Sequence, residues 1–200
     1  MVRLYKALIG VGKDLQELGI RWALVGGIAV SLRSEPRTTR DLDIAVATRS
    51  NRETDNLIRD LAARGYRRME PDQHRAHRVT GRVAMDRLLT PKENVEGVAV
   101  DLLFSFSGIE EEIVEAADLV EVSPGHSLPV ATRGHLMALK VLAGRLQDKA
   151  DFSNLLEEAD ARDLMEAELA AELIDRRGLH PNRQVLLELA RLREECAGYG

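Results

Sequence analysis

The sequence has little of what defines several protein classes. It contains one cysteine, seven aromatic residues (one Trp, three Tyr, three Phe) and no apolar run longer than the eleven residues 22–32. One cysteine excludes an internal disulfide and fits a reducing compartment. A membrane-spanning helix needs about 20 apolar residues, and the start of the chain lacks a secretory pattern. We therefore expect a cytoplasmic protein with no membrane segment.

The 200 residues are 44% hydrophobic, which is enough for one compact core, or for a core with a helical appendage. The net charge of -5 is unevenly spread. Residues 33–92 hold 14 Lys and Arg against 9 Asp and Glu, whereas residues 93–200 hold 10 against 22. The basic stretch could receive a nucleic acid or a triphosphate, or it could be an ion-paired surface. Its arginines include Arg64, Arg67, Arg68, Arg75, Arg78, Arg82 and Arg87.

The hydrophobic pattern changes character near residue 130. Before that point, helical spacing or capping residues predict helices, and apolar or β-branched runs predict strands between them. We expect helices at 2–18, 27–32, 50–64 and 107–117, and strands at 22–25, 41–47, 66–69, 76–79, 83–89, 98–106 and 119–122. After it, four helices are expected at 132–143, 148–158, 163–177 and 181–195. The pattern predicts an α/β (α+β) fold with a mixed core in residues 1–130 and a helical region in residues 131–200 packed on it.

Two aspartates alternate with leucine in Asp41–Leu42–Asp43. Residues i and i+2 of a strand share a face, so both carboxylates should point into one site, where their repulsion favours a bound cation. Ahead of them, Gly26 and Gly27 precede a short helix whose first N–H groups could hold a phosphate. Each motif alone has a plain explanation, as a solvated edge or a glycine turn. Together they predict chemistry on a nucleotide.

A third carboxylate is expected on a later strand. Asp101 is the single charge within the apolar run 98–104, and a buried charge is costly unless it is paired or binds metal. It could instead simply contact an arginine. The competing candidate, Asp86, has less apolar flanks and an arginine beside it. We favour Asp101.

The helical half contains one charge in an unusual position. Lys140 falls within the apolar stripe of Leu136, Leu139 and Ala143. Such a lysine either reaches past the stripe to solvent or points into a cleft, where it could bind a triphosphate. Downstream, Asp148 and Asp151 lie one helical turn apart and share a face.

These motifs resemble two known signatures. Gly26, Gly27, Asp41, Asp43 and Asp101 resemble the nucleotidyltransferase superfamily of DNA polymerase β, with its Gly-Gly turn, Asp-x-Asp strand and later third Asp. The run 136–156 and the motif 37–43 are similar to the AbiEii/MenT-type branch, through the residues Arg37, Thr39, Lys140, Arg145, Asp148 and Asp151. Gln147 and Phe152 depart from that pattern, where Lys and Leu are usual. The resemblance covers roughly residues 22–156.

The resemblance implies a small mixed-sheet nucleotidyltransferase palm followed by a helical bundle. It also implies transfer of a nucleoside monophosphate from an NTP to an acceptor hydroxyl. Two Mg²⁺ ions, or Mn²⁺ in their place, would be held by Asp41, Asp43 and Asp101, with Asp101 accepting the hydroxyl proton. The nucleotide would contact Gly26, Gly27, Arg37, Thr39 and Asp148, and Lys140 would neutralise phosphate charge as part of the catalytic set.

Members of this branch include toxins of toxin–antitoxin pairs that add nucleotides to tRNA ends. The resemblance therefore implies an RNA acceptor, a tRNA 3′ end, and a cognate antitoxin as partner. Two alternatives remain open: a small-molecule transferase of the aminoglycoside type, and a non-catalytic nucleotide-binding partner protein. The intact acids at all three positions argue against the last.

Overall fold

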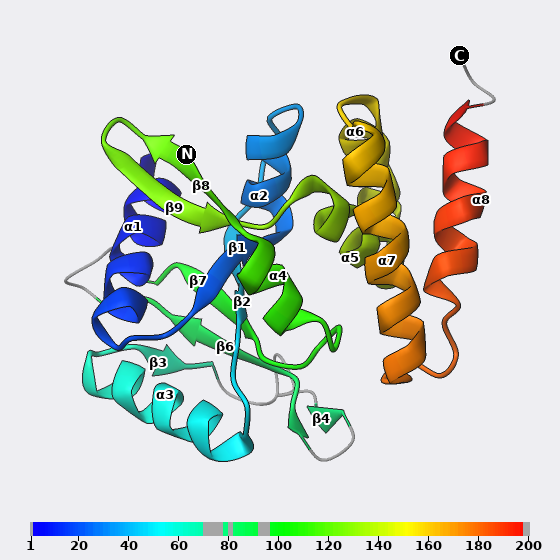
Figure 1. Ribbon diagram of the computed structural model, residues 1–200. Helices are drawn as coiled ribbons and strands as arrows, with labels where there is room; N and C mark the ends of the chain where they lie inside the picture. The colour runs from blue at the N-terminus through cyan, green and yellow to red at the C-terminus, as the bar shows by residue number, and fades with distance from the viewer. Residues whose placement is uncertain (1, 70–77, 80–81, 92–96, 198–200) are drawn as a thin grey trace.

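The computed structural model describes residues 2–69, 78–79, 82–91 and 97–197, with side chains omitted at 78–79, 82–83 and 197. Within these residues, seven strands form one mixed sheet in the order β3-β6-β7-β2-β1-β9-β8 (Figure 1). The strands are β1 (Trp22–Val25), β2 (Asp41–Val46), β3 (Arg67–Arg68), β6 (Met85–Leu89), β7 (Ala99–Leu103), β8 (Asp118–Ser123) and β9 (His126–Val130). A separate hairpin pairs β4 (Arg78–Val79) with β5 (Arg82–Val83). The predicted mixed α/β architecture is confirmed.

Alternation along the central strands divides the sheet into two chemically different faces. Strand β2 runs antiparallel to β1 and parallel to β7, and β7 runs antiparallel to β6. Leu42 and Ile44 lie opposite Val100 and Leu102, and all four are at most 1% exposed. The intervening positions of β2 carry Asp41 and Asp43. One face therefore forms the core, and the acids emerge on the other.

Eight helices surround the sheet in the described part of the chain. They are α1 (Val2–Glu17), α2 (Gly26–Arg33), α3 (Asn51–Ala63), α4 (Glu110–Ala116), α5 (Arg133–Ala143), α6 (Leu146–Glu157), α7 (Ala161–Arg177) and α8 (Val185–Ala197). Helices α5 to α8 stand together beside the sheet, and α2 lies between it and α5 (Figure 1). None of these helices has both the length and the apolar content to cross a membrane.

Local signals explain where several helices begin and end. Ser50 accepts a hydrogen bond from the Glu53 N–H at the start of α3, as its capping pattern predicts. Thr132 likewise caps α5, and Gly144 ends that helix in the left-handed conformation, with φ of 67°. The predicted Ser107 cap is wrong in detail. Helix α4 begins at Glu110, whose buried carboxylate accepts from the N–H and hydroxyl of Ser107.

Strand β9 is the main element that the sequence did not predict. Its parallel contact with β1 rests on the pair Leu24 and Val130, which are 106 positions apart, and no local pattern encodes such pairing. Pro129, inside the strand, also argued against it. The predicted strand 76–79 is present as β4, and its first two positions lie outside the described residues.

Candidate active site

The turn between β1 and α2 brings the backbone against an acidic side chain. Gly26 has a φ of +65°, and a Cβ on it would lie 1.9 Å from Asp43 Oδ2 and 2.5 Å from Asp43 Cβ. The next N–H, that of Gly27, donates a hydrogen bond to Asp43. A side chain at position 26 is therefore excluded twice, by the left-handed backbone and by the neighbouring carboxylate. The Gly-Gly pair predicted as a phosphate-binding turn lies directly beside the predicted acids.

The three predicted acids face the same side of the sheet. Asp43 on β2 lies opposite Asp101 on the parallel strand β7, and Asp41 is two residues before Asp43. Burial, followed by the charges of Asp41 and Asp101, raises the pKa of Asp43 from 3.8 to about 7, against the lowering effect of Lys140 and the Gly27 N–H. Burial is the larger cause of the raised pKa, and the neighbouring carboxylates add to it.

One arginine partly balances that charge. Arg87 on β6 lies opposite Asp101, and its Nε and Nη2 atoms donate to the two oxygens of the Asp101 carboxylate. Nη2 also lies 3.5 Å from Asp41 Oδ2. Asp41 accepts a further hydrogen bond, of 3.1 Å, from the Thr39 hydroxyl. Both features considered for Asp101, proximity to the acid pair and contact with an arginine, are present together.

Asp41, Asp43 and Asp101 have the chemistry of divalent-cation ligands, but Asp101 is paired with Arg87. Among the described residues, no three His, Cys, Asp or Glu side chains are arranged to hold one metal ion. Carboxylate oxygens are the ligands that Mg²⁺ prefers, and a cation would oppose both the burial and the carboxylate repulsion that raise the pKa of Asp43. Arg87 donates to both oxygens of Asp101, so a metal ligated by Asp101 would compete with that guanidinium.

Asp86, the competing third acid, is excluded from this group. It lies opposite Leu102 on β7, on the other face of the sheet from Arg87 and Asp101. Arg68 on β3 donates from its Nε to both Asp86 oxygens, at 3.0 and 2.7 Å. Asp86 is thus a structural ion-pair partner.

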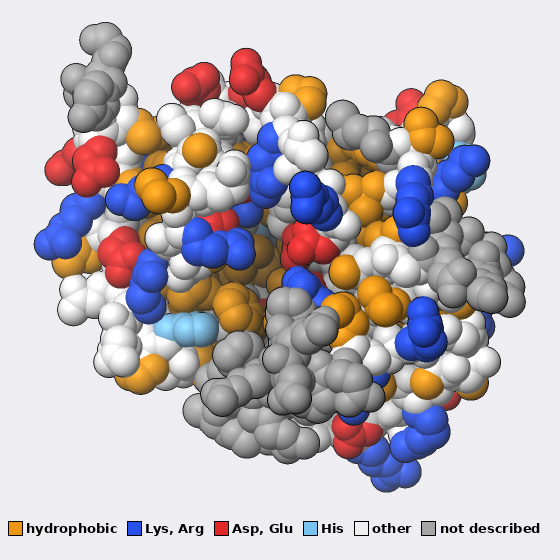
Figure 2. Space-filling model, turned by 180° about the vertical axis from the view of Figure 1, so that it is seen from behind, with side chains coloured by type: hydrophobic (Ala, Val, Ile, Leu, Met, Phe, Trp, Pro, Cys, Tyr) orange, Lys and Arg blue, Asp and Glu red, His pale blue; other side chains and the backbone are white. Residues whose placement is uncertain are grey.

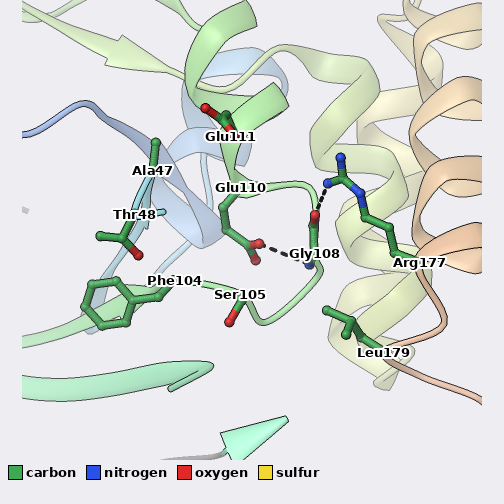
Figure 3. A pocket seen from close by; sticks show the side chains of 9 residues that line it. All are labelled: Ala47, Thr48, Phe104, Ser105, Gly108, Glu110, Glu111, Arg177 and Leu179. Atoms are coloured by element: carbon green, nitrogen blue, oxygen red, sulfur yellow. Dashed lines mark hydrogen bonds between the residues drawn. The ribbon is translucent and has the colours of Figure 1, made fainter. Parts of the chain in front are cut away.

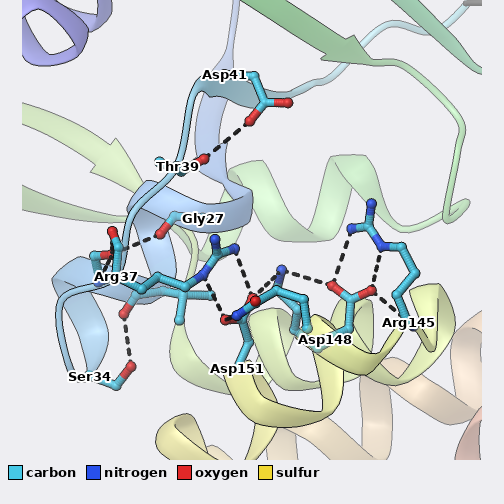
Figure 4. A network of polar contacts seen from close by, with 12 residues as sticks. Gly27, Ser34, Arg37, Thr39, Asp41, Arg145, Asp148 and Asp151 are labelled. Atoms are coloured by element: carbon cyan, nitrogen blue, oxygen red, sulfur yellow. Dashed lines mark hydrogen bonds and ion pairs between the residues drawn. The ribbon is translucent and has the colours of Figure 1, made fainter. Parts of the chain in front are cut away.

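A buried ion network joins the helices to the loop before β2 (Figure 4). Lys140 Nζ lies 3.1 Å from Asp148 Oδ1 and 2.8 Å from Asp151 Oδ2, and all three residues are at most 6% exposed. Arg37 reaches from the loop to Asp151, with Nε 2.7 Å from Oδ1. Arg145 holds Asp148 at 2.7 Å. Lys140 therefore neither reaches solvent nor stands free in a cleft.

Electrostatics link this network to the acids. Burial opposes ionisation of Asp148, but hydrogen bonds from Arg145 and the charge of Lys140 lower its pKa below the ordinary value. The fields of Asp41 and Asp43 contribute to the raised pKa of Arg145. Figure 2 shows Lys and Arg side chains around acidic ones near the middle of the face opposite that of Figure 1.

The predicted nucleotide residues occupy different parts of this region. Gly27 lies under the loop, because a Cβ on it would meet Arg37 Nη2 at 2.8 Å and Thr39 Oγ1 at 2.9 Å. Asp148 lies inside the helical network. Sequence reasoning missed the pairing of Arg87 with Asp101, because Arg87 was considered only within the basic stretch and as a neighbour of Asp86. Alternation within 83–89 already placed Arg87 on the opposite face from Asp86.

Several arginines of the basic stretch form ion pairs in the part of the chain that the structure describes. Arg64 donates to Asp14 and Glu17, Arg68 to Asp86, and Arg87 to Asp101. Arg75 and the side chains of Arg78 and Arg82 lie outside the described residues.

A separate cavity of about 370 Å³ lies at the far ends of β2 and β7 from Asp41 (Figure 3). Glu110 accepts from the Gly108 N–H at 3.0 Å, and Arg177 donates to the Gly108 carbonyl. The cavity contains none of the predicted site residues. Its lining is Ala47, Thr48, Phe104, Ser105, Gly108, Glu110, Glu111, Arg177 and Leu179.

Comparison with known protein families accounts for this arrangement. The profile of the family described as "Nucleotidyl transferase AbiEii toxin, Type IV TA system" matches residues 13–195. The chain belongs to the AbiEii nucleotidyltransferase family. It is therefore an enzyme of the nucleotidyltransferase class, as the paired motifs predicted. Comparison with curated protein sequences gave no match.

Solved structures support the fold of this AbiEii family member. An antigenic nucleotidyltransferase-like protein from Paracoccidioides brasiliensis is 18% identical, with a TM-score of 0.51 over 92% of this chain and 91% of that one. The lincosamide antibiotic adenylyltransferase LnuA, bound to lincomycin, is 16% identical, with a TM-score of 0.50 over 77% of this chain and 97% of that one. At these identities the likeness establishes the fold alone.

The approach of Asp43 to Gly26 can be tested by stability measurements. Gly26→Ala should lower the free energy of unfolding by about 2–4 kcal/mol, because it combines a left-handed backbone with a steric clash. Gly125→Ala is the matched control: its φ is +76°, and nothing lies within 4 Å of an added Cβ. It should lose only about 1–2 kcal/mol, the backbone cost. Equal losses in urea denaturation would show that Asp43 does not crowd Gly26.

The buried network can be tested at Lys140. Lys140→Met should lower the free energy of unfolding by about 3–5 kcal/mol, because it leaves Asp148 and Asp151 buried without their shared cation. Lys149→Met, on the neighbouring helix α6, is the control. Lys149 is exposed, so its replacement should change stability by no more than about 0.5 kcal/mol. Native-like stability of Lys140→Met would refute the structural role.

The raised pKa of Asp43 predicts a pH-dependent stability without metal. The folded value of about 7 exceeds the reference value of 3.8, so stability falls as pH rises from about 4 to 7 and stays low above that. Asp43→Asn should therefore gain about 1–3 kcal/mol at pH 8 in EDTA and nothing near pH 4. The figure is below full conversion of the pKa difference because the side chain keeps some exposure.

Asp148→Asn is the control of opposite sign for that measurement. Its carboxyl has a lowered pKa, so its contribution to stability is present at neutral pH and is lost as the pH falls. The variant should be less stable than wild type at pH 8. A gain at pH 8 for both variants, or for neither, would contradict the electrostatic assignment.

Proposed function

We propose that this enzyme transfers a nucleoside monophosphate from an NTP to a hydroxyl at a tRNA 3′ end, as the toxin of a toxin–antitoxin pair. One observation carries the catalytic part. Asp43 and Asp101 lie in register on neighbouring strands, with Asp41 on the same face. Together with the Gly26–Gly27 turn beside them, they group carboxylates with a phosphate-binding element.

The acids have the chemistry of a Mg²⁺ site. Asp41, Asp43 and Asp101 would hold two Mg²⁺ ions, or Mn²⁺ in their place. When bound, such ions stabilise the charge of the attacking and leaving oxygens in an in-line displacement. The excess negative charge expressed in the raised pKa of Asp43 supports this role.

The nucleotide would be positioned by groups around the turn. The N–H groups at the start of α2 would bind phosphate oxygens, and the Gly27 N–H already binds a carboxylate there. Arg37 and Thr39 order the loop above Gly27 and would lie along the triphosphate. Lys140 would lower the cost of phosphate charge through its field, which already reaches Asp43. Asp148 would keep Lys140 and Arg145 in place.

The reaction balances as one displacement with one proton transfer. The acceptor hydroxyl oxygen bonds to the α-phosphorus of the NTP. The bond from that phosphorus to the oxygen bridging the β-phosphorus breaks, and pyrophosphate leaves. The hydroxyl proton passes to the Asp101 carboxylate, once its oxygens are free of Arg87.

The choice of an RNA acceptor rests on family and charge. The matched family is described as a toxin of a type IV toxin–antitoxin system, which also favours a cognate antitoxin and a cytoplasmic location. Arginines around the site, among them Arg145 with 76% of its side chain exposed, could contact RNA phosphates. A small-molecule acceptor is the competing outcome of the test.

The decisive experiment compares two buried aspartates on opposite faces of the sheet. Wild type, Asp101→Asn and Asp86→Asn are each incubated with one labelled NTP at a time, Mg²⁺ and total RNA. Asp101→Asn should lose at least about 100-fold in transfer rate, whereas Asp86→Asn should stay within a few-fold of wild type. Melting temperatures check that both variants are folded.

Each result bears on a different part of the proposal. Label appearing in tRNA supports the acceptor, and its removal by 3′-terminal nuclease digestion locates the site. In a parallel reaction that also contains an aminoglycoside, label found only in that compound would show that the acceptor is a small molecule and not RNA. Equal activity of Asp101→Asn and wild type would refute the assigned acid cluster.

A further inference from the structure

The row of residues across the centre of the sheet contains a cation among acids. In register, Arg87 on β6 lies opposite Asp101 on β7, Asp101 opposite Asp43 on β2, and Asp43 opposite Val25 on β1. Val25 immediately precedes the Gly26–Gly27 turn. The arginine, the acids and the proposed phosphate site therefore form one continuous line on one face.

The pairing of Arg87 uses the oxygens that a metal would need. Its guanidinium donates to both oxygens of Asp101, and Nη2 extends toward Asp41 at 3.5 Å. Asp101 is 4% exposed and the Arg87 side chain 19% exposed, so solvent reaches the pair poorly. A cation bridging Asp101 to Asp41 and this guanidinium compete for the same space.

Arg87 gives up a bidentate, charge-assisted pair when it leaves Asp101, and breaking such a pair at a partly buried site is costly. A replacement anion offsets that cost when Asp101 changes partner. A triphosphate supplies one within the same line of residues, and the planar guanidinium fork matches phosphate oxygens as well as carboxylate oxygens. When metal and nucleotide arrive together, the metal takes the place of Arg87 at Asp101, and the phosphates take the place of Asp101 at Arg87.

We propose that Arg87 is a displaceable internal counter-ion that makes divalent metal binding depend on bound NTP. Without nucleotide, Arg87 holds Asp101 and opposes the metal. With nucleotide, Arg87 passes from Asp101 to the phosphates, and Asp101 becomes available. This inference rests on the proposed function and adds that metal binding depends on bound nucleotide. By linkage, metal and nucleotide should each tighten the binding of the other by the same factor.

The test measures Mn²⁺ affinity by electron paramagnetic resonance of free Mn²⁺, with and without a non-hydrolysable NTP analogue. Wild type should bind Mn²⁺ weakly alone and about tenfold or more tightly with the analogue. Arg87→Gln should bind Mn²⁺ alone about tenfold more tightly than wild type and gain little from the analogue. Its affinity for the analogue should fall, because one phosphate partner is lost.

Two controls separate direct competition from a general change of charge. Arg145→Gln also removes a positive charge within the field of Asp41 and Asp43, but Arg145 pairs with Asp148 and not with Asp101. Its Mn²⁺ affinity should rise by no more than about threefold. Arg68→Gln breaks a similar Arg–Asp pair on the opposite face and should leave Mn²⁺ affinity unchanged.

The outcomes distinguish this inference from the proposed function. If wild type binds Mn²⁺ with the analogue but Arg87→Gln has wild-type affinities, Arg87 is not the competitor, and the proposed function stands. A gain in Arg145→Gln equal to that in Arg87→Gln also overturns the inference. If no protein binds Mn²⁺ under any condition, both fail. Should Arg87→Gln not fold, Arg87→Lys, which keeps the charge but not the fork, should bind Mn²⁺ alone more tightly than wild type; no change in it overturns the inference.

Discussion

The gathering of three carboxylates on one face of the sheet is the constraint on which the rest of the site depends. Asp43 and Asp101 meet because β2 and β7 are parallel and in register, and Asp41 joins them through the two-residue period of the strand. Burial, with the added repulsion of Asp41 and Asp101, raises the pKa of Asp43. Close contact with Gly26 and the bond from the Gly27 N–H follow from the same crowding. A fold that keeps such a cluster without a stabilising reason would lose it readily to substitution, which is why we interpret it as functional.

The helical half fixes the geometry of the site from a distance. Asp151 receives Arg37 from the loop before β2 and Lys140 from α5, so the loop, α5 and α6 converge on one buried carboxylate. Buried ion pairs of this kind contribute little net stability, because desolvation offsets their attraction, but breaking one is costly. The network therefore selects one arrangement of the loop over Gly27. Placement of the loop is what a triphosphate site requires, since an error of about 1 Å can cost much of the rate.

The local part of this structure could be predicted from the sequence, and the part set across strands could not. Alternation placed Asp41 and Asp43 on one face, and an isolated charge in an apolar run identified Asp101. The glycine pair was identified as a turn before a helix. By contrast, Arg87 and Asp101 are brought together by strand register, and Lys140 meets Asp151 through the angle between two helices. Single-sequence patterns contain neither the register of non-adjacent strands nor helix packing angles, and the same gap hid β9.

The two Arg–Asp pairs of strands β3, β6 and β7 show why chemistry alone does not identify a functional residue. Arg68 with Asp86 and Arg87 with Asp101 are both bidentate pairs, and both aspartates are 4% exposed. Asp86 has an arginine and apolar neighbours, so one cation balances one anion, and the pair is complete. Asp101 stands beside two further carboxylates, so a single guanidinium faces three acids, and the charges of Asp41 and Asp101 add to the burial that raises the pKa of Asp43. The difference between the two pairs lies in the neighbouring strands. Asp101 has another acid, Asp43, opposite it on β2. Asp86 has Leu102 opposite it on β7, and Leu102 in turn has Ile44 opposite it on β2, so no second acid adjoins that pair in register.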